Sequence, residues 1–159
     1  GSEPGERWLA KRYSVSFKAA GIYAAGGWVD TMEVATTWDN LNALYEAVLQ
    51  AVSPHAFIMA HFSHAYREGC SIYFTFAAAR RDVGRAEELY DAVWQSALDA
   101  VHDVGATASH HHGVGLHKMH AMPAEHGDML RVYYALKRVL DPNGIMNPGK
   151  LFPPEQMEA

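Results

Sequence analysis

The sequence predicts an α+β domain in which helices pack on one face of a mainly antiparallel sheet. Three observations favour this fold class: apolar residues alternate with polar ones in short segments, other apolar residues recur at steps of three and four, and one pair of strands has a short connection. The 159 residues are enough to bury one core, and no internal repeat divides them.

The first part of the chain predicts a helix, a strand and a second helix. Residues 7–25 carry aromatic side chains among small and basic ones, which favours a helix. Trp28–Thr36 is rich in β-branched and aromatic residues and predicts a strand. Thr37 or Asp39 is then expected to cap a helix that ends at 53–54, where a serine precedes a proline. The apolar stripe of that helix comprises Leu41, Leu44, Tyr45, Val48, Leu49 and Val52.

The middle of the chain predicts a hairpin of two strands, residues 56–63 and 71–78. Alternation along the second strand separates its two faces. We expect the core face to carry Ile72, Phe74 and Phe76, and the opposite face to present the hydroxyls of Ser71, Tyr73 and Thr75.

Two more helices and an extended tail are expected after the hairpin. Asp82 can cap a helix that ends near Gly105. Pro123 is placed as the first residue of a last helix that continues to Leu140. Residues 141–144 (Asp-Pro-Asn-Gly) predict a turn, and the segment 145–153 is expected to be extended.

Composition excludes several classes of function. The chain has 13 basic and 18 acidic residues, a net charge of −5, and no basic stripe, so we predict no nucleic-acid partner. One cysteine excludes an internal disulfide framework and a cysteine-based zinc ribbon. No segment is apolar enough to predict a membrane span, and we expect a cytoplasmic protein. The leading Gly1-Ser2 pair is interpreted as a cloning remnant.

Histidine is the unusual component, with ten in all and three in succession before Gly-Val-Gly. Consecutive side chains alternate in an extended loop, so His110 and His112 are expected to face one cavity, with His111 turned away or bonded to the scaffold. Imidazole transfers protons near neutral pH, which favours a catalytic role. A solvated surface loop is the plain alternative.

A metal site is a second functional interpretation of the histidines. His110 with His112, or His117 with His120, offer nitrogen ligands, but no cysteine accompanies them and we predict no metal site. His64 and Arg67, at the hairpin connection, are candidates for binding an anionic substrate, as is Lys18. A solvated turn is the alternative for these residues.

Three motifs together resemble one family. They are residues 64–76 (His-Ala-Tyr, two residues, then Gly-Cys-Ser-Ile-Tyr-Phe-Thr-Phe), residues 109–115 (Ser-His-His-His-Gly-Val-Gly) and residues 141–151 (Asp-Pro-Asn-Gly-Ile-Met-Asn-Pro-Gly-Lys-Leu). With the strand around residues 29–38, they resemble the C-terminal part of alkyldihydroxyacetonephosphate-synthase-like FAD-binding proteins of the vanillyl-alcohol-oxidase type. The resemblance runs from about Trp28 to Leu151.

The resemblance implies a ferredoxin-like cap domain in an FAD-dependent enzyme, here as residues 28–140 between a helical segment (1–27) and a tail (141–159). It implies exchange of the acyl group of acyl-dihydroxyacetone phosphate for a fatty alcohol. Tyr73 is implied as the proton-transfer residue, and His110, His111 and His112 as groups around flavin and substrate. Asn147 and Lys150 are implied to contact FAD.

Two other functions are kept beside this one: an FAD-linked 2-hydroxy-acid dehydrogenase of the D-lactate or glycolate type, and a histidine-rich metal-binding module. The expected partners are a lipid-phosphate or hydroxy-acid substrate, the FAD-binding domain of the same protein and a second copy in a homodimer. Membrane association through the substrate is also expected. The chain alone is expected neither to bind FAD tightly nor to turn over.

Overall fold

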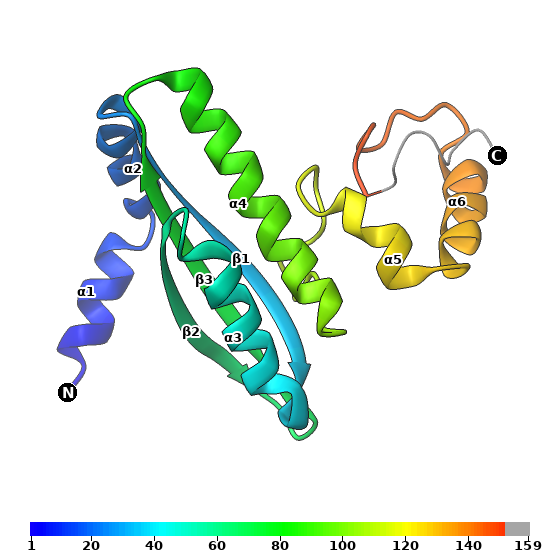
Figure 1. Ribbon diagram of the computed structural model, residues 1–159, viewed down its shortest axis with the longest axis horizontal. Coiled ribbons are helices and arrows are strands. Elements are labelled where there is room, and N and C mark those ends of the chain that lie inside the picture. Colours follow the sequence, from blue (N-terminus) through cyan, green and yellow to red (C-terminus); the bar gives the residue numbers. More distant parts are fainter. Residues whose placement is uncertain (152–159) are drawn as a thin grey trace.

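The computed structural model describes residues 1–151, apart from the side chains of Val15, Ser16 and Lys18. Its centre is a βαββα unit (Figure 1). The elements of this unit are β1 (Gly27–Thr37), α3 (Leu41–Val52), β2 (Phe57–Ala65), β3 (Gly69–Ala79) and α4 (Val83–Asp103).

The three strands form one antiparallel sheet in the order β1-β3-β2, and α3 and α4 lie on the same side of it (Figure 1). We call the side covered by these helices the helix face and the opposite side the outer face. The helix face of β1 and β3 carries core side chains that are all 0% exposed: Met32, Val34, Ile72, Phe74 and Phe76. The expected fold class and the alternation along the second hairpin strand are therefore confirmed.

After α4 the chain forms a single β-bridge with the free edge of β1. Thr107 follows α4 and pairs with Ala35 in antiparallel fashion, with backbone N···O distances of 3.0 and 3.4 Å. A βαββαβ fold would place its fourth strand at this edge. Here the segment after α4 makes one bridge and then turns into the histidine-containing loop.

Two local predictions were wrong and a third was confirmed. The expected helix over 7–25 is divided into α1 (Glu3–Lys11) and α2 (Val15–Ala24), because Ser14 turns back to donate to the Lys11 carbonyl. Neither Thr37 nor Asp39 caps α3, which follows a short 3-10 turn, Trp38–Asn40. The cap predicted at Asp82 is confirmed, since its carboxylate accepts from the Arg85 amide at 3.0 Å.

The last predicted helix is also two helices, α5 (Met122–His126) and α6 (Met129–Leu140). Gly127 separates them with a φ of 51°, a left-handed conformation that a continuous helix does not contain. Both lie apart from the sheet, at the end of the loop that follows α4 (Figure 1). The second 3-10 turn, Met119–Ala121, leads into α5.

Asp141 holds the turn after α6. Its carboxylate accepts from the amides of Ile145 and Met146, each at 3.0 Å, and from the Lys137 ammonium. The predicted turn over 141–144 is confirmed, and the chain is non-helical from 142 to 151, with residues 152 and 153 of the expected extended segment outside the described part. No helix within residues 1–151 combines the length and apolarity that a membrane span requires.

Candidate active site

A buried carboxylate lies at the centre of the outer face. Glu33 is 1% exposed, and strand alternation places it opposite to its apolar neighbours Met32 and Val34. In the register of the sheet it lies beside Tyr73 of β3. The two residues therefore project from neighbouring strands toward the same side.

Hydroxyl donors stabilise the ionised form of this carboxylate. Ser71 donates to Glu33 Oε1 at 2.7 Å, and Ser63 donates to the same oxygen at 2.5 Å. Ser63 lies in β2 where the pairing register shifts between Phe62 and His64. Burial favours the neutral acid and by itself would raise the pKa of Glu33. The serine hydrogen bonds, the positive potential of His111 and the hydrogen bond to His64 act in the opposite direction. Together they outweigh burial and lower the pKa of Glu33 to about 2. Glu33 is therefore a fixed negative charge at neutral pH.

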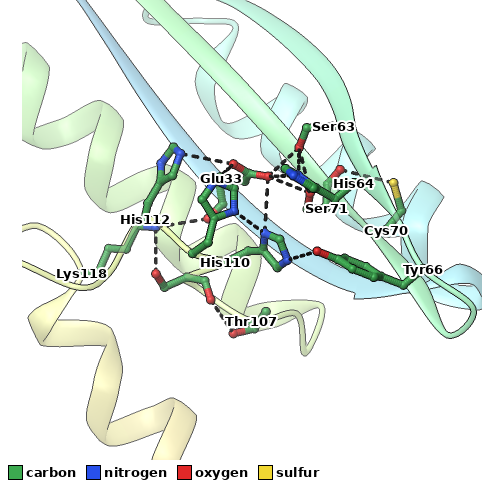
Figure 2. Close-up of polar contacts among 12 residues, drawn as sticks. Glu33, Ser63, His64, Tyr66, Cys70, Ser71, Thr107, His110, His112 and Lys118 are labelled. Atoms are coloured by element: carbon green, nitrogen blue, oxygen red, sulfur yellow. Dashed lines mark hydrogen bonds and ion pairs between the residues drawn. The ribbon is translucent and has the colours of Figure 1, made fainter.

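The imidazoles of His64, His110 and His112 lie around this charge (Figure 2), and the imidazole of His111 also contacts it. Nδ1 of His64 and of His110 lie 3.3 and 3.4 Å from Glu33 Oε1, and Nε2 of His111 and of His112 each lie 3.2 Å from Oε2. Of the two alternatives expected for His111, the one in which it turns away is wrong, because its imidazole contacts Glu33 of β1. The His111 φ of 43° takes the backbone out of the extended conformation, so three successive side chains reach one carboxylate.

Tyr73 completes the outer-face cluster, which we define as Glu33, Tyr73, His64 and residues 110–112. The ring centroids of Tyr73 and His112 are 5.3 Å apart, with an interplanar angle of 86°. Burial lowers the pKa of His112, an effect that the Glu33 carboxylate opposes and neighbouring cations reinforce. A neutral His112 imidazole beside a phenol provides a proton acceptor and a proton donor at one place.

Lys118 links the histidine-containing loop to β1 through hydrogen bonds. It is 3% exposed, and its ammonium donates to the Glu33 carbonyl at 3.2 Å and to Ser109 Oγ at 3.5 Å. The His110 amide donates to the same carbonyl at 3.1 Å. Burial lowers the pKa of Lys118 to about 8, against the opposing effect of Glu125 and Glu33.

The remaining predicted substrate-binding residues are placed differently. His64 joins the cluster with a half-exposed side chain. Arg67 is exposed, and its backbone carbonyl accepts a hydrogen bond from the Trp38 indole at 3.1 Å. The side chain of Lys18 lies outside the described part, so this prediction stays a prediction.

The two residues predicted to contact FAD line an open groove of about 770 Å³ beside the loop. Asn147 and Lys150 contribute one wall, Val114 and Gly115 the loop side, and α5 and α6 the floor, so the tail predicted to contact FAD and the histidine-containing loop border the same space. The other lining residues are mostly apolar: Met122, Leu130, Tyr133, Leu136, Leu140, Met146 and Leu151, with His126, Lys137 and Asp141.

The cluster also has the composition of a metal site. Ligand atoms of Glu33, His64, His110 and His111 all lie within 4.8 Å of one another. This set differs from both sequence pairs, because His112 is outside it and His117 packs against α4, stacked on Trp94 at 4.9 Å. Carboxylate oxygen and imidazole nitrogen are ligands that divalent zinc accepts.

Sequence reasoning missed Glu33, Lys118 and Tyr66, whose hydroxyl lies 3.1 Å from His110 Nε2. The signal for Glu33 was present as a carboxylate between two apolar residues of the predicted strand, Met32 and Val34. Its partners depended on the strand register and on the loop path, which the sequence does not display.

Comparison with known proteins identifies a family that matches this chain. The family described as FAD linked oxidases, C-terminal domain, matches residues 2–151. Alkyldihydroxyacetonephosphate synthase of Dictyostelium discoideum is 33% identical over 162 aligned residues, covering 96% of this chain and 26% of that protein. The mitochondrial D-lactate dehydrogenase (cytochrome) of Arabidopsis thaliana is 35% identical over 107 residues, covering 67% of this chain and 18% of that protein.

Solved structures agree with the sequence comparisons. A structure of an alkyldihydroxyacetonephosphate synthase has a TM-score of 0.58 and 27% identity, covering 91% of this chain and 25% of the other. The chain thus spans about a quarter of the length of the first relatives that it matches.

Proposed function

This chain belongs to the family of FAD-linked oxidase C-terminal domains, and from that premise we propose that it is the substrate domain of an enzyme resembling alkyldihydroxyacetonephosphate synthase. The proposed reaction exchanges the acyl group of acyl-dihydroxyacetone phosphate for a fatty alcohol. The observation that carries the proposal is the convergence of Tyr73 and three successive histidines on the buried Glu33 carboxylate.

The exchange requires a proton to leave the substrate carbon and later return, and the attacking alcohol must lose its own proton. Tyr73 is the group proposed to hold the proton that moves at the substrate carbon. His112, which lies against it with a lowered pKa, is the proposed acceptor for the alcohol proton. The Glu33 carboxylate then stabilises the imidazolium that forms, because it lies 3.2 Å from His112 Nε2.

FAD is the proposed cofactor of the longer protein, and the groove beside the loop fits one side of it. Asn147 and Lys150 offer an amide and a cation there, while the mostly apolar walls suit a planar ring. When bound, FAD supplies the electron-accepting ring of the reaction. The residues of this chain bind and orient the substrate, exclude water and move protons.

The proposal includes the partners of the domain. They are the FAD-binding domain of the same protein, which would face the outer-face cluster and the groove, and a lipid-phosphate substrate. We also propose a homodimer, a cytoplasmic location and membrane contact through the lipid substrate. His64 is the proposed substrate-binding residue nearest the reactive groups, since its side chain is 49% exposed at the edge of the cluster.

The test is an exchange assay on the full-length flavoprotein with acyl-dihydroxyacetone phosphate and a labelled fatty alcohol. We expect His112→Ala to lower the rate of ether product formation by about 10²–10⁴, the usual contribution of a general acid or base. His102→Ala is the matched control, because this exposed histidine lies at the end of α4, away from the outer face. Normal turnover in His112→Ala would remove this histidine from the proposed site.

A second candidate is an FAD-linked 2-hydroxy-acid dehydrogenase, favoured by the similarity to the Arabidopsis D-lactate dehydrogenase. In that reaction the substrate is oxidised, so D-lactate or glycolate would bleach the flavin absorbance of the full-length protein. The exchange reaction has no net redox change and leaves the absorbance at its starting value after turnover. Bleaching by a hydroxy acid without ether formation would select the dehydrogenase.

A third candidate, a metal-binding module, is favoured by the spacing of Glu33, His64, His110 and His111. Elemental analysis of protein purified without chelators distinguishes it, because a metal module would carry stoichiometric zinc. A metal content far below one per chain, in protein whose exchange activity resists chelators, supports proton transfer by the same residues.

A further inference from the structure

A hydrogen-bonded series leads outward from the buried carboxylate to a tyrosine that no predicted role includes. Glu33 Oε2 lies 3.2 Å from His111 Nε2, and His111 Nδ1 lies 2.8 Å from His110 Nδ1. His110 Nε2 in turn lies 3.1 Å from the hydroxyl of Tyr66, a contact drawn in Figure 2. The series thus has three links and joins four side chains.

The chemistry of these groups assigns a direction to each link. Ionised Glu33 only accepts, so His111 donates from Nε2, and in the imidazole with one proton the other nitrogen, Nδ1, is the acceptor. His110 must donate from Nδ1, which leaves its Nε2 to accept from the Tyr66 hydroxyl. The 3.4 Å approach of His110 Nδ1 to Glu33 Oε1 requires the same proton position. Every donor in the series faces an acceptor.

The buried end of this path is Glu33, and its outer end is Tyr66. Glu33 is 1% exposed, the His111 side chain 50%, the His110 side chain 21% and Tyr66 50%. Tyr66 sits in the tight connection between β2 and β3, where its amide donates to the Gly69 carbonyl at 2.8 Å and its carbonyl accepts from the Trp38 indole at 3.1 Å. The side chain of Tyr66 is therefore held in contact with solvent, with its hydroxyl beside His110 of the cluster.

We propose that Tyr66, His110 and His111 form a proton relay between solvent and the Glu33 site. The relay rests on the proposed function for its use, since it would supply and remove the protons that the exchange requires. The inference concerns a route for protons and a residue, Tyr66, at its outer end.

The proton balance is simple. A hydronium ion in solvent gives a proton to the Tyr66 oxygen and is left as water, while the Tyr66 hydroxyl proton passes to His110 Nε2 and the Nδ1 proton of His110 passes to His111 Nδ1. His111 then carries two protons and one positive charge beside the Glu33 carboxylate, and it can give the Nε2 proton to a substrate oxygen. Return of one proton from the substrate and reversal of the series restore the starting tautomers. The exchange also releases the alcohol proton, because the displaced acyl group leaves as a carboxylate at neutral pH, and the same series can carry that proton to solvent.

The chain itself provides the first test, through ¹⁵N NMR of its imidazoles above pH 8, where free imidazole is neutral. We expect His110 as the Nδ1–H tautomer and His111 as the Nε2–H tautomer. In Tyr66→Phe the unprotonated Nε2 resonance of His110 should move, since it loses its donor. Tyr45→Phe is the matched control, because the Tyr45 ring packs on Phe62 and lies outside the series. An Nε2–H tautomer at His110, or an unmoved resonance in Tyr66→Phe, would overturn the relay.

Kinetics of the full-length flavoprotein provide the second test. Tyr66→Phe should lower kcat of the exchange about tenfold, less than loss of a group that contacts the substrate, while Tyr45→Phe stays at the wild-type rate. Unchanged kcat in Tyr66→Phe overturns the relay even where Tyr73→Phe is inactive. The expected tautomers in a protein without exchange activity would instead overturn the proposed function and leave the relay standing.

Discussion

The two faces of the sheet carry alternate residues of the same strands, and both faces are buried around position 33. On the helix face, Met32, Val34 and Phe74 pack with 0% exposure. On the outer face, Glu33 and Ser71 are as deeply buried, at 1% and 0%. Burial therefore does not distinguish the face that stabilises the fold from the face that carries the chemistry.

What distinguishes the faces is the cost of burial. Apolar side chains gain free energy when they leave water, whereas a buried carboxylate costs free energy unless donors replace its hydration. Two serine hydroxyls and four imidazoles replace it around Glu33. A cluster that needs so many donors is expected to be retained for its reactivity rather than for its contribution to stability.

The largest expected effect on stability lies on the helix face. Phe74→Ala removes a ring from the centre of the core and should lower the free energy of unfolding by about 3–5 kcal/mol. Chemical denaturation of this chain measures it. Thr75→Ala, one residue along and on the outer face, is the control and should change the same free energy by about 0.5 kcal/mol or less. Equal losses in the two variants would contradict the division between the faces.

The next effect is a pH-dependent one at Glu33. Its pKa is about 2 in the fold against the ordinary 4.5, so the ionised carboxylate contributes about 3 kcal/mol to stability at neutral pH. Because the pKa is lowered, this contribution is present above pH 4.5 and is lost as the pH falls toward 2. The difference in unfolding free energy between wild type and Glu33→Gln should shrink through that window.

The control for this measurement is Glu46→Gln, an exposed glutamate of α3. Its difference from wild type should stay small at every pH, since exposed groups contribute little. A gap between wild type and Glu33→Gln that is the same at pH 7 and pH 3 would mean that the carboxylate is not held in its ionised form.

A smaller effect is expected from one hydroxyl. Ser71→Ala removes a donor at 2.7 Å from Glu33 and should cost about 1 kcal/mol. It should also raise the pKa of Glu33, moving the acid loss of stability to higher pH. Acid titration of the unfolding free energy shows both, and a variant with the wild-type acid profile would remove Ser71 from the stabilisation of the carboxylate.

The smallest effect concerns the pH at which activity is lost. His112 must be neutral to accept a proton, and its pKa is lowered by burial, so the acid limb of kcat/KM should lie below the ordinary imidazole value of 6.5. A pH profile of the full-length enzyme measures it. An acid limb above 6.5 would contradict a buried neutral His112 as the acceptor.

Much of the fold was predictable from the sequence because its strands alternate cleanly. The alternation of Ile72, Phe74 and Phe76 with Ser71, Tyr73 and Thr75 correctly separated the two faces of β3. Helix boundaries were harder, since a left-handed glycine at 127 and a serine turn at 14 each divide a segment that was predicted as one helix.

The candidate site was predictable in its residue types but not in its centre. The triple histidine and Tyr73 were visible as an unusual loop and a polar strand position, and the structure brings them together. Glu33 was hidden because its partners come from β2, β3 and a loop more than 70 residues away, which only strand register and tertiary folding connect. The left-handed backbone conformation of His111 was also not predictable, because it depends on the path of the folded loop.

The most direct test compares two neighbouring residues on opposite faces in the full-length flavoprotein. Tyr73→Phe should lower kcat of the acyl-for-alcohol exchange by about 10²–10⁴ with an unchanged free energy of unfolding. Phe74→Leu should lower the free energy of unfolding by about 1 kcal/mol with a near-normal kcat. Normal exchange in Tyr73→Phe, with activity lost only where stability is lost, would contradict a reactive outer face.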